Sequence, residues 1–129
     1  MEKQFTAQLL GDLIFKNLFK NLNLFLRTYQ NDTSNSNVWY TSKVTQEDGK
    51  VVYGVLLQWP ADGVVAVTSP VHGADTVVTL LGWSGGPLQV TSDKDQGTMT
   101  IHLPDKARAE LNWAWTLKFV HLENGGNFI

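Results

Sequence analysis

One short motif in the chain resembles the nucleophile turn of a hydrolase. Residues 82–86 read Gly-Trp-Ser-Gly-Gly and fit the pattern G-x-S-x-G, in which a strained strand-to-helix turn presents a reactive serine. Residues 85–87, Gly-Gly-Pro, lead into another short β-rich run instead of a helix. A chain of 129 residues is also too short for the large α/β sheet that supports such a serine. The sequence therefore predicts a flexible loop between strands here.

Other polar groups could in principle bind a metal ion. Residues 93–97, Asp-Lys-Asp-Gln-Gly, resemble a calcium loop, but the glycine comes one position early and the closing glutamate is absent, so a hairpin turn is predicted. His72, His102 and His121 have neither an i,i+4 partner nor a glutamate at ligand spacing, and we expect them at surface or edge positions. We expect no catalytic residue, no metal site and no cofactor in this chain.

Tryptophan is abundant, with five residues in the chain, and the flat indole face is a surface on which sugar rings stack. Trp59, Trp113 and Trp115 fall on apolar faces of predicted strands and are expected in the core. Trp39 fits either the core or the rim. Trp83 lies in a glycine-rich loop, so Trp83 and Trp39 are the candidates for carbohydrate contact.

The elements that would position these residues are strands, because from Val38 onward the apolar residues recur with a period of two. The odd positions of residues 51–59 are all apolar, which predicts a central strand with one strongly buried face. The clearest alternation spans residues 111–119, where Leu111, Trp113, Trp115, Leu117 and Phe119 share one face. Five more short runs are found at residues 38–43, 64–68, 76–81, 87–91 and 98–103. About seven strands without intervening helices predict an antiparallel β-sandwich.

Residues 1–28 have a different pattern and predict an amphipathic α-helix of about 18 residues. Its apolar face comprises Ile14, Phe15, Leu18, Phe19, Leu22, Phe25 and Leu26, opposite Lys16, Lys20, Asn23 and Arg27. Polar residues interrupt the segment too often for a secretory signal or a membrane span. It could pack on a neighbouring surface, bind at a membrane surface, or lack settled structure, and packing is the expectation.

Residues 29–37 read as a polar linker, residues 38–123 as the sandwich and residues 124–129 as a flexible tail. Asn31-Asp32-Thr33 fits the N-glycosylation pattern, so Asn31 is a candidate acceptor, although the pattern often occurs by chance.

Composition excludes several classes of protein. A hydrophobic content of 43% and a charged content of 17% indicate one globular domain. A net charge of −2 provides no basic field, so nucleic acid is not an expected partner. The absence of cysteine excludes disulfides and thiolate metal sites.

An ordered set of short segments carries a family resemblance. They are Gln30–Thr33, Val38–Lys43, Val52-Tyr53, Leu57–Pro60, Leu80–Gly82 and Trp113–Lys118. In this order and spacing they resemble the C-terminal domain of animal α-L-fucosidases, especially the plasma type, from about residue 28 to residue 123.

The resemblance implies a β-sandwich accessory domain that follows a (β/α)-barrel in a lysosomal or secreted glycoside hydrolase. Both catalytic carboxylates would belong to that barrel, and neither can be placed in this chain. We therefore expect a noncatalytic module, a truncated or partial form, whose partner is a catalytic barrel or a second copy. The alternative is an independent carbohydrate-binding or protein-interaction module.

Overall fold

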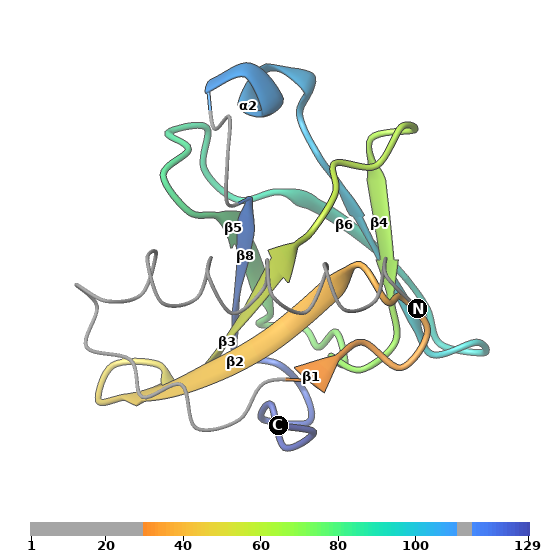
Figure 1. Ribbon diagram of the computed structural model, residues 1–129. Coiled ribbons are helices and arrows are strands. Elements are labelled where there is room, and N and C mark those ends of the chain that lie inside the picture. The colour runs from red at the N-terminus through yellow and green to blue at the C-terminus, as the bar shows by residue number, and fades with distance from the viewer. Residues whose placement is uncertain (1–29, 111–114) are drawn as a thin grey trace.

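The computed structural model describes residues 30–110 and 115–129, which form two antiparallel β-sheets around a common core (Figure 1). The larger sheet has the order β1 (Gln30–Asn31), β2 (Val38–Thr45), β3 (Gly49–Leu56), β8 (Thr116–Val120) and β5 (Val77–Leu80). The smaller sheet has the order β4 (Val64–Val67), β7 (Thr98–His102) and β6 (Gln89–Asp93). The predicted antiparallel β-sandwich is confirmed.

The core lies between the two sheets and is built from alternate residues of their strands. The larger sheet contributes Val38, Tyr40, Val52, Leu56, Val78, Leu80, Leu117 and Phe119, and the smaller sheet contributes Val65, Val67, Met99 and Ile101. Full burial of each aliphatic or aromatic side chain contributes about 1.5–3 kcal/mol, so this cluster holds the two layers together.

Gly54 lets two aromatic rings approach each other within this core. A Cβ atom at Gly54 would lie 3.1 Å from the Phe119 ring and 3.2 Å from the Tyr40 ring. Because that space is free, Tyr40 and Phe119 pack edge to face with ring centroids 6.1 Å apart. A larger residue at this position would therefore force one of the two rings to shift by a few tenths of an ångström.

The odd face of strand β3 is strongly buried as predicted, but the even face is buried as well and is the one that meets the core between the sheets. Val52 and Leu56 belong to the core cluster between the sheets. Val51 and Val55 alternate with them on the opposite face, yet both are completely buried. A continuous apolar run does not reveal which of its two faces meets the main core.

The sequence pattern predicts a strand over residues 111–119, and the structure differs in that Trp115 lies outside any strand and β8 begins only at Thr116. Residues 111–114 lie outside the described residues. A short helix that the pattern did not predict, α2 (Asp105–Glu110), comes before them. Pro104 and Asp105 start the helix, and Ala107 anchors it in the core. Leu117 and Phe119 face inward as predicted.

The tryptophans predicted in the core differ in how deeply they are buried. Trp59 is buried in the core as predicted, and its ring meets that of Trp115 edge to face at 5.3 Å. Trp115 precedes the strand and is only partly buried. Trp113 lies outside the described residues.

The predicted linker contains the short edge strand β1, whose Gln30 and Asn31 pair with Tyr40 and Trp39. The predicted helix of residues 1–28 lies outside the described residues. No helix in the described ranges is long and apolar enough to cross a membrane.

Residues 124–129, expected as a flexible tail, form turns with specific contacts. The Phe128 ring packs edge to face on Tyr40 at 5.0 Å, and Gln30 Nε2 donates a hydrogen bond of 2.8 Å to the Phe128 carbonyl. The C-terminal turns thereby pack beside the β1–β2 edge of the larger sheet.

Candidate functional site

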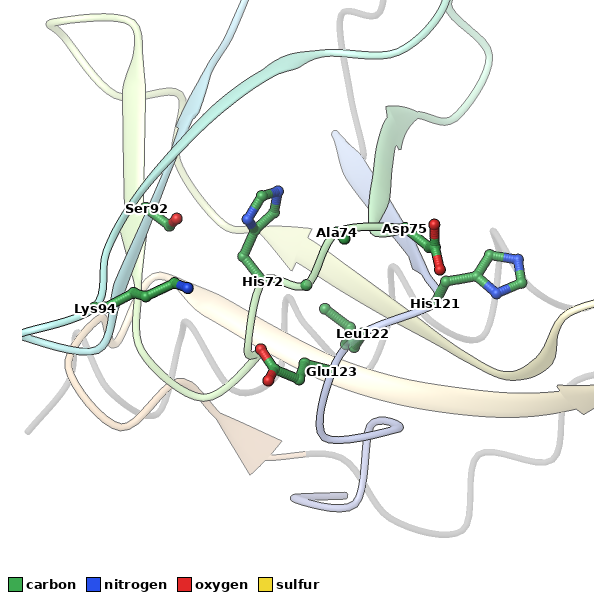
Figure 2. Close-up of a pocket in the computed structure, with 9 residues that line it drawn as sticks. His72, Ala74, Asp75, Ser92, Lys94, His121, Leu122 and Glu123 are labelled. Atoms are coloured by element: carbon green, nitrogen blue, oxygen red, sulfur yellow. The ribbon is translucent and has the colours of Figure 1, made fainter.

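A groove of about 750 Å³ is lined by residues of three separate segments: the β4–β5 connection, the end of β6 with its turn, and the residues after β8. Its polar lining residues are His72, Asp75, Ser92, Lys94, His121 and Glu123. Figure 2 shows Ser92 and Lys94 on one side of His72, and Asp75 and His121 on the other. A smaller hollow of about 190 Å³ shares His72, Ser92, Lys94 and Glu123, so the two form one continuous surface feature.

Two hydrogen bonds to backbone carbonyls hold two of these segments together. The Glu123 amide donates to the Val71 carbonyl at 2.9 Å, and Thr76 Oγ1 donates to the His121 carbonyl at 2.7 Å. Gly73 fits beside Glu123, where an added Cβ would lie 3.1 Å from the glutamate Cβ. The wall formed by residues 71–76 and 121–123 is therefore fixed by the Glu123 amide and the Thr76 hydroxyl, and the side chains of His72 and Glu123 take no part in these bonds.

His121 occupies a rare backbone conformation at this wall. Its φ of 57° lies in the left-handed region, which costs a residue other than glycine of order 1 kcal/mol or more. The ring Nε2 lies 3.2 Å from Asp48 Oδ1. The turn and this contact together give the imidazole a defined orientation at the rim of the groove.

The groove offers hydrogen bonds of both kinds. Lys94 donates, Asp75 and Glu123 accept, and the Ser92 hydroxyl can do either. Such a mixed lining suits a neutral polyhydroxylated ligand better than a polyanion. Among residues 30–110 and 115–129, no group of three metal-ligating side chains gathers at one place.

A second polar cluster centres on the buried carboxylate of Asp32. We name it the Asp32 junction, and it consists of Asp32, Ser34, Tyr40, Thr68 and Ser69. Asp32 is only 3% exposed, and its carboxylate accepts hydrogen bonds from Tyr40 Oη at 2.7 Å and from the Ser69 amide at 2.9 Å. The amides of Ser34 and Thr68 add bonds of 3.0 Å and 3.1 Å.

These hydrogen bonds set the charge state of the junction. Burial by itself would raise the pKa of Asp32, but the bonds from the Ser69 amide, the Tyr40 hydroxyl and the amides of Ser34 and Thr68 outweigh it and hold the pKa below its usual value. Burial and the neighbouring carboxylate raise the pKa of Tyr40. A charged Asp32 therefore ties the loop after β1 to the end of β4.

The predicted carbohydrate contacts, Trp83 and Trp39, are not among the residues that line the groove. The Trp83 indole folds back over Gly85 and packs partly buried against the core. Trp39 is half-buried on β2, opposite Val55 of β3. Their role in sugar binding stays a prediction.

Asn31, the candidate glycosylation acceptor, is exposed on β1. The two residues that follow it have structural partners: Asp32 forms the junction, and Thr33 Oγ1 lies 3.0 Å from Ser69 Oγ. Its glycosylation also stays a prediction.

The two motifs that resembled functional loops are connections between strands. Residues 82–86 lie between β5 and β6 with no helix after them, and Gly82 and Gly86 have φ of 80° and 82°. Residues 93–97 turn from β6 into β7, and Asp93 Oδ1 accepts the Asp95 amide at 3.0 Å. The predicted hairpin turn at residues 93–97 is confirmed, and so is the place of residues 82–86 between two strands.

The sequence did not single out the groove. Its residues come from three connections with no common spacing, and only the sandwich brings them together. A usable signal was that His72 lies in a predicted connection between strands and that His121 directly follows a predicted strand. The third histidine, His102, is half-buried at the end of β7.

Comparison with known proteins identifies the sandwich. The alpha-L-fucosidase C-terminal domain matches residues 30–120. The chain is 38% identical over 96 residues to a plasma alpha-L-fucosidase of Rattus norvegicus, covering 72% of this chain and 20% of the relative. It is 36% identical over 89 residues to a tissue alpha-L-fucosidase of Homo sapiens, covering 67% of this chain and 18% of the relative.

An alpha-L-fucosidase of Branchiostoma floridae gives a similar result, with 36% identity over 91 residues, 69% of this chain and 19% of the relative. The match thus spans about a fifth of the length of these curated relatives. The chain belongs to the family of alpha-L-fucosidase C-terminal domains.

Proposed function

We propose that this chain is the noncatalytic β-sandwich of an α-L-fucosidase, an enzyme that removes terminal α-L-fucose from glycoproteins and glycolipids. The observation that carries the proposal is the extent of the match, because residues 30–120 correspond to one domain and to only about a fifth of each relative. The sandwich would stabilise, or assemble with, a catalytic barrel. Because relatives are named plasma and tissue fucosidases, we also propose a secreted or lysosomal setting.

Activity of the isolated chain is the first test. The purified protein should not hydrolyse an aryl α-L-fucoside above the buffer background, since the proposal places both catalytic carboxylates in the barrel. Turnover that copurifies with the folded chain would overturn the noncatalytic role.

A chimaera tests the supporting role directly. Residues 30–129 would replace the matched C-terminal domain of the Rattus norvegicus relative, and the comparison is with the same relative lacking that domain. We expect the chimaera to be soluble and active and the truncated enzyme to lose soluble activity. A chimaera carrying Asp32→Ala is the matched control, because it should fail by unfolding the sandwich. Equal activity of the chimaera and the truncated enzyme would contradict the proposal.

The groove favours a second candidate function, carbohydrate binding by the sandwich itself. Its mixed donors and acceptors fit sugar hydroxyls, and its volume of about 750 Å³ exceeds that of a single sugar ring. Titration with L-fucose and a fucosylated oligosaccharide, followed by NMR, should shift resonances of His72 and Lys94. Ser84→Ala, outside the groove, should leave any such shifts unchanged, whereas an absence of shifts at millimolar sugar would remove this candidate.

A further inference from the structure

The edge strands of the two sheets differ in how well they are protected. The edges are β1 and β5 in the larger sheet and β4 and β6 in the smaller one. Strand β1 has only two residues. On β4 the Ala66 carbonyl accepts a hydrogen bond of 3.1 Å from Asn35 Nδ2, and on β5 the Val78 carbonyl accepts one of 2.8 Å from the Leu88 amide. Short length and occupied backbone groups make these three edges poor templates for another chain.

Strand β6 is the edge that stays open among the residues that the structure describes. Four of its five residues are exposed. Within residues 30–110 and 115–129, its backbone hydrogen bonds are those with β7. Every second residue of an edge strand directs its N–H and C=O away from the neighbouring strand. The strand also contains neither proline nor lysine, the residues that commonly block pairing at an edge.

The side chains of β6 alternate between two faces of the smaller sheet. Val90 packs against the core, and Ser92 lines the groove. Gln89, Thr91 and Asp93 therefore share the opposite face, where all three are exposed. Thr91 stands at the midpoint of the strand, with an amide on one side of it and a carboxylate on the other.

We propose that β6 pairs with β6 of a second copy of this chain, antiparallel about a two-fold axis at Thr91, and joins the smaller sheets of both copies. This register places Thr91 opposite Thr91 of the second copy, and Gln89 opposite the second copy's Asp93. Opposed threonines can hydrogen-bond to each other, and the glutamine amide donates to the carboxylate. The two Asp93 carboxylates stay apart, so the strand is complementary to itself, as a two-fold interface requires.

This interface adjoins the groove. Ser92 and Lys94, which line one side of the groove, lie at the end of the same strand and directly after it (Figure 2). A ligand in the groove would therefore lie beside the paired strands. The inference itself rests on the open edge and does not depend on the proposed function.

Crosslinking of cysteine variants tests both the pairing and its register, since the chain contains no cysteine. In the proposed register, Thr91→Cys brings two thiols directly opposite each other, with Cβ atoms about 5 Å apart. Gln89→Cys is the matched control, because it lies on the same face of the same strand but is roughly 14 Å from its counterpart along the strand. A short thiol crosslinker is applied to each full-length variant, and covalent dimers are measured on a denaturing gel.

We expect Thr91→Cys to form covalent dimers several-fold faster than Gln89→Cys. Equal rates for the two variants would show random collision and overturn the proposal. Circular dichroism checks that both variants keep the β signal of the wild type, which is expected because both positions are exposed.

A pair of charge variants tests the same interface without a covalent link. Analytical ultracentrifugation of the wild-type full chain over a range of concentrations should show a monomer–dimer equilibrium. Thr91→Lys opposes two like charges and should raise the dissociation constant several-fold, whereas Gln89→Lys faces Asp93 of the second copy and should leave the dimer as tight or tighter. A wild type that is monomeric at every concentration, or equal weakening by the two lysines, would overturn the proposal.

Discussion

The Asp32 junction and the groove are both polar, and both use the connection between β4 and β5. Thr68 and Ser69 of this connection donate to the buried Asp32 carboxylate, whereas His72 and Asp75, a few residues later, line the open groove. In the junction the Asp32 side chain accepts the hydrogen bonds that connect the loop after β1 to the end of β4. In the groove the wall is held by the Glu123 amide and the Thr76 hydroxyl, while the lining side chains face the opening. The contrast separates polar residues that stabilise from those that are available to a ligand.

The largest effect is expected from Asp32→Ala. The substitution leaves the Thr68 and Ser69 amides and the Tyr40 hydroxyl without their acceptor, and each unsatisfied buried group costs about 1–3 kcal/mol. We therefore expect the free energy of unfolding to fall by about 3–5 kcal/mol, measured by urea denaturation. The control is Asn31→Ala on the exposed neighbouring residue, which should change stability by less than about 0.5 kcal/mol. A loss below about 1 kcal/mol for Asp32→Ala would mean that water replaces the carboxylate and the junction is not structural.

Tyr40→Phe should have a smaller effect. It removes one donor to Asp32 at 2.7 Å but keeps the backbone donors and the ring, which packs on Phe119 and Phe128. We expect a loss of about 1–2 kcal/mol, typical of one hydrogen bond to a charged group. A double-mutant cycle with Asp32→Ala would show a coupling energy near that value, and strict additivity of the two losses would show that the contact contributes nothing.

The pH dependence of stability follows from the same pair. Because the pKa of Asp32 is lowered in the folded state, its contribution is present above the unfolded pKa near 4 and is lost as the pH falls through the lower folded value. The raised pKa of Tyr40 acts in the opposite range: its contribution is complete below pH 10 and declines at higher pH. Urea denaturation of wild type, Asp32→Asn and Tyr40→Phe across pH 2–11 measures both limbs.

In that series Asp32→Asn should flatten the acid limb, while Tyr40→Phe should flatten the alkaline limb. If Asp32→Asn unfolds with the same acid dependence as the wild type, other carboxylates dominate the acid response. That result would weaken the contrast between the two clusters, because Asp32 would then be one carboxylate among many.

Most strands could be predicted from the sequence, because their apolar residues recur with a period of two, as in β2 and β7. It failed at Trp115, which lies outside β8 although it continues the apolar alternation of that strand, and at the short helix α2. A helix of six residues is also shorter than the window in which helical periodicity can be recognised. Pro104 followed by Asp105 was the one local signal for it.

The roles of polar residues were harder to predict than the strands. Asp32 lay in a segment that carried the family resemblance, but its partners Thr68 and Ser69 are 36 and 37 residues away. The groove likewise joins residues of three distant connections. Local patterns fix strands, whereas contacts between loops depend on how the whole sandwich closes.

The smallest effect on stability is expected in the groove. His72→Ala and Lys94→Ala remove side chains that face the opening, while the hydrogen bonds that fix the wall run through the backbone of Val71 and Glu123. Each variant should change the free energy of unfolding by less than about 0.5 kcal/mol, as surface substitutions usually do. Ser84→Ala, exposed in the β5–β6 loop, is the matched control. His121 is unsuitable for this test because it also contacts Asp48 and adopts a left-handed backbone.

Unchanged urea midpoints combined with weakened sugar binding would separate binding from folding in this region. A loss above about 1 kcal/mol in either variant would instead place its side chain among the groups that hold the sandwich together, and the contrast with the Asp32 junction would disappear.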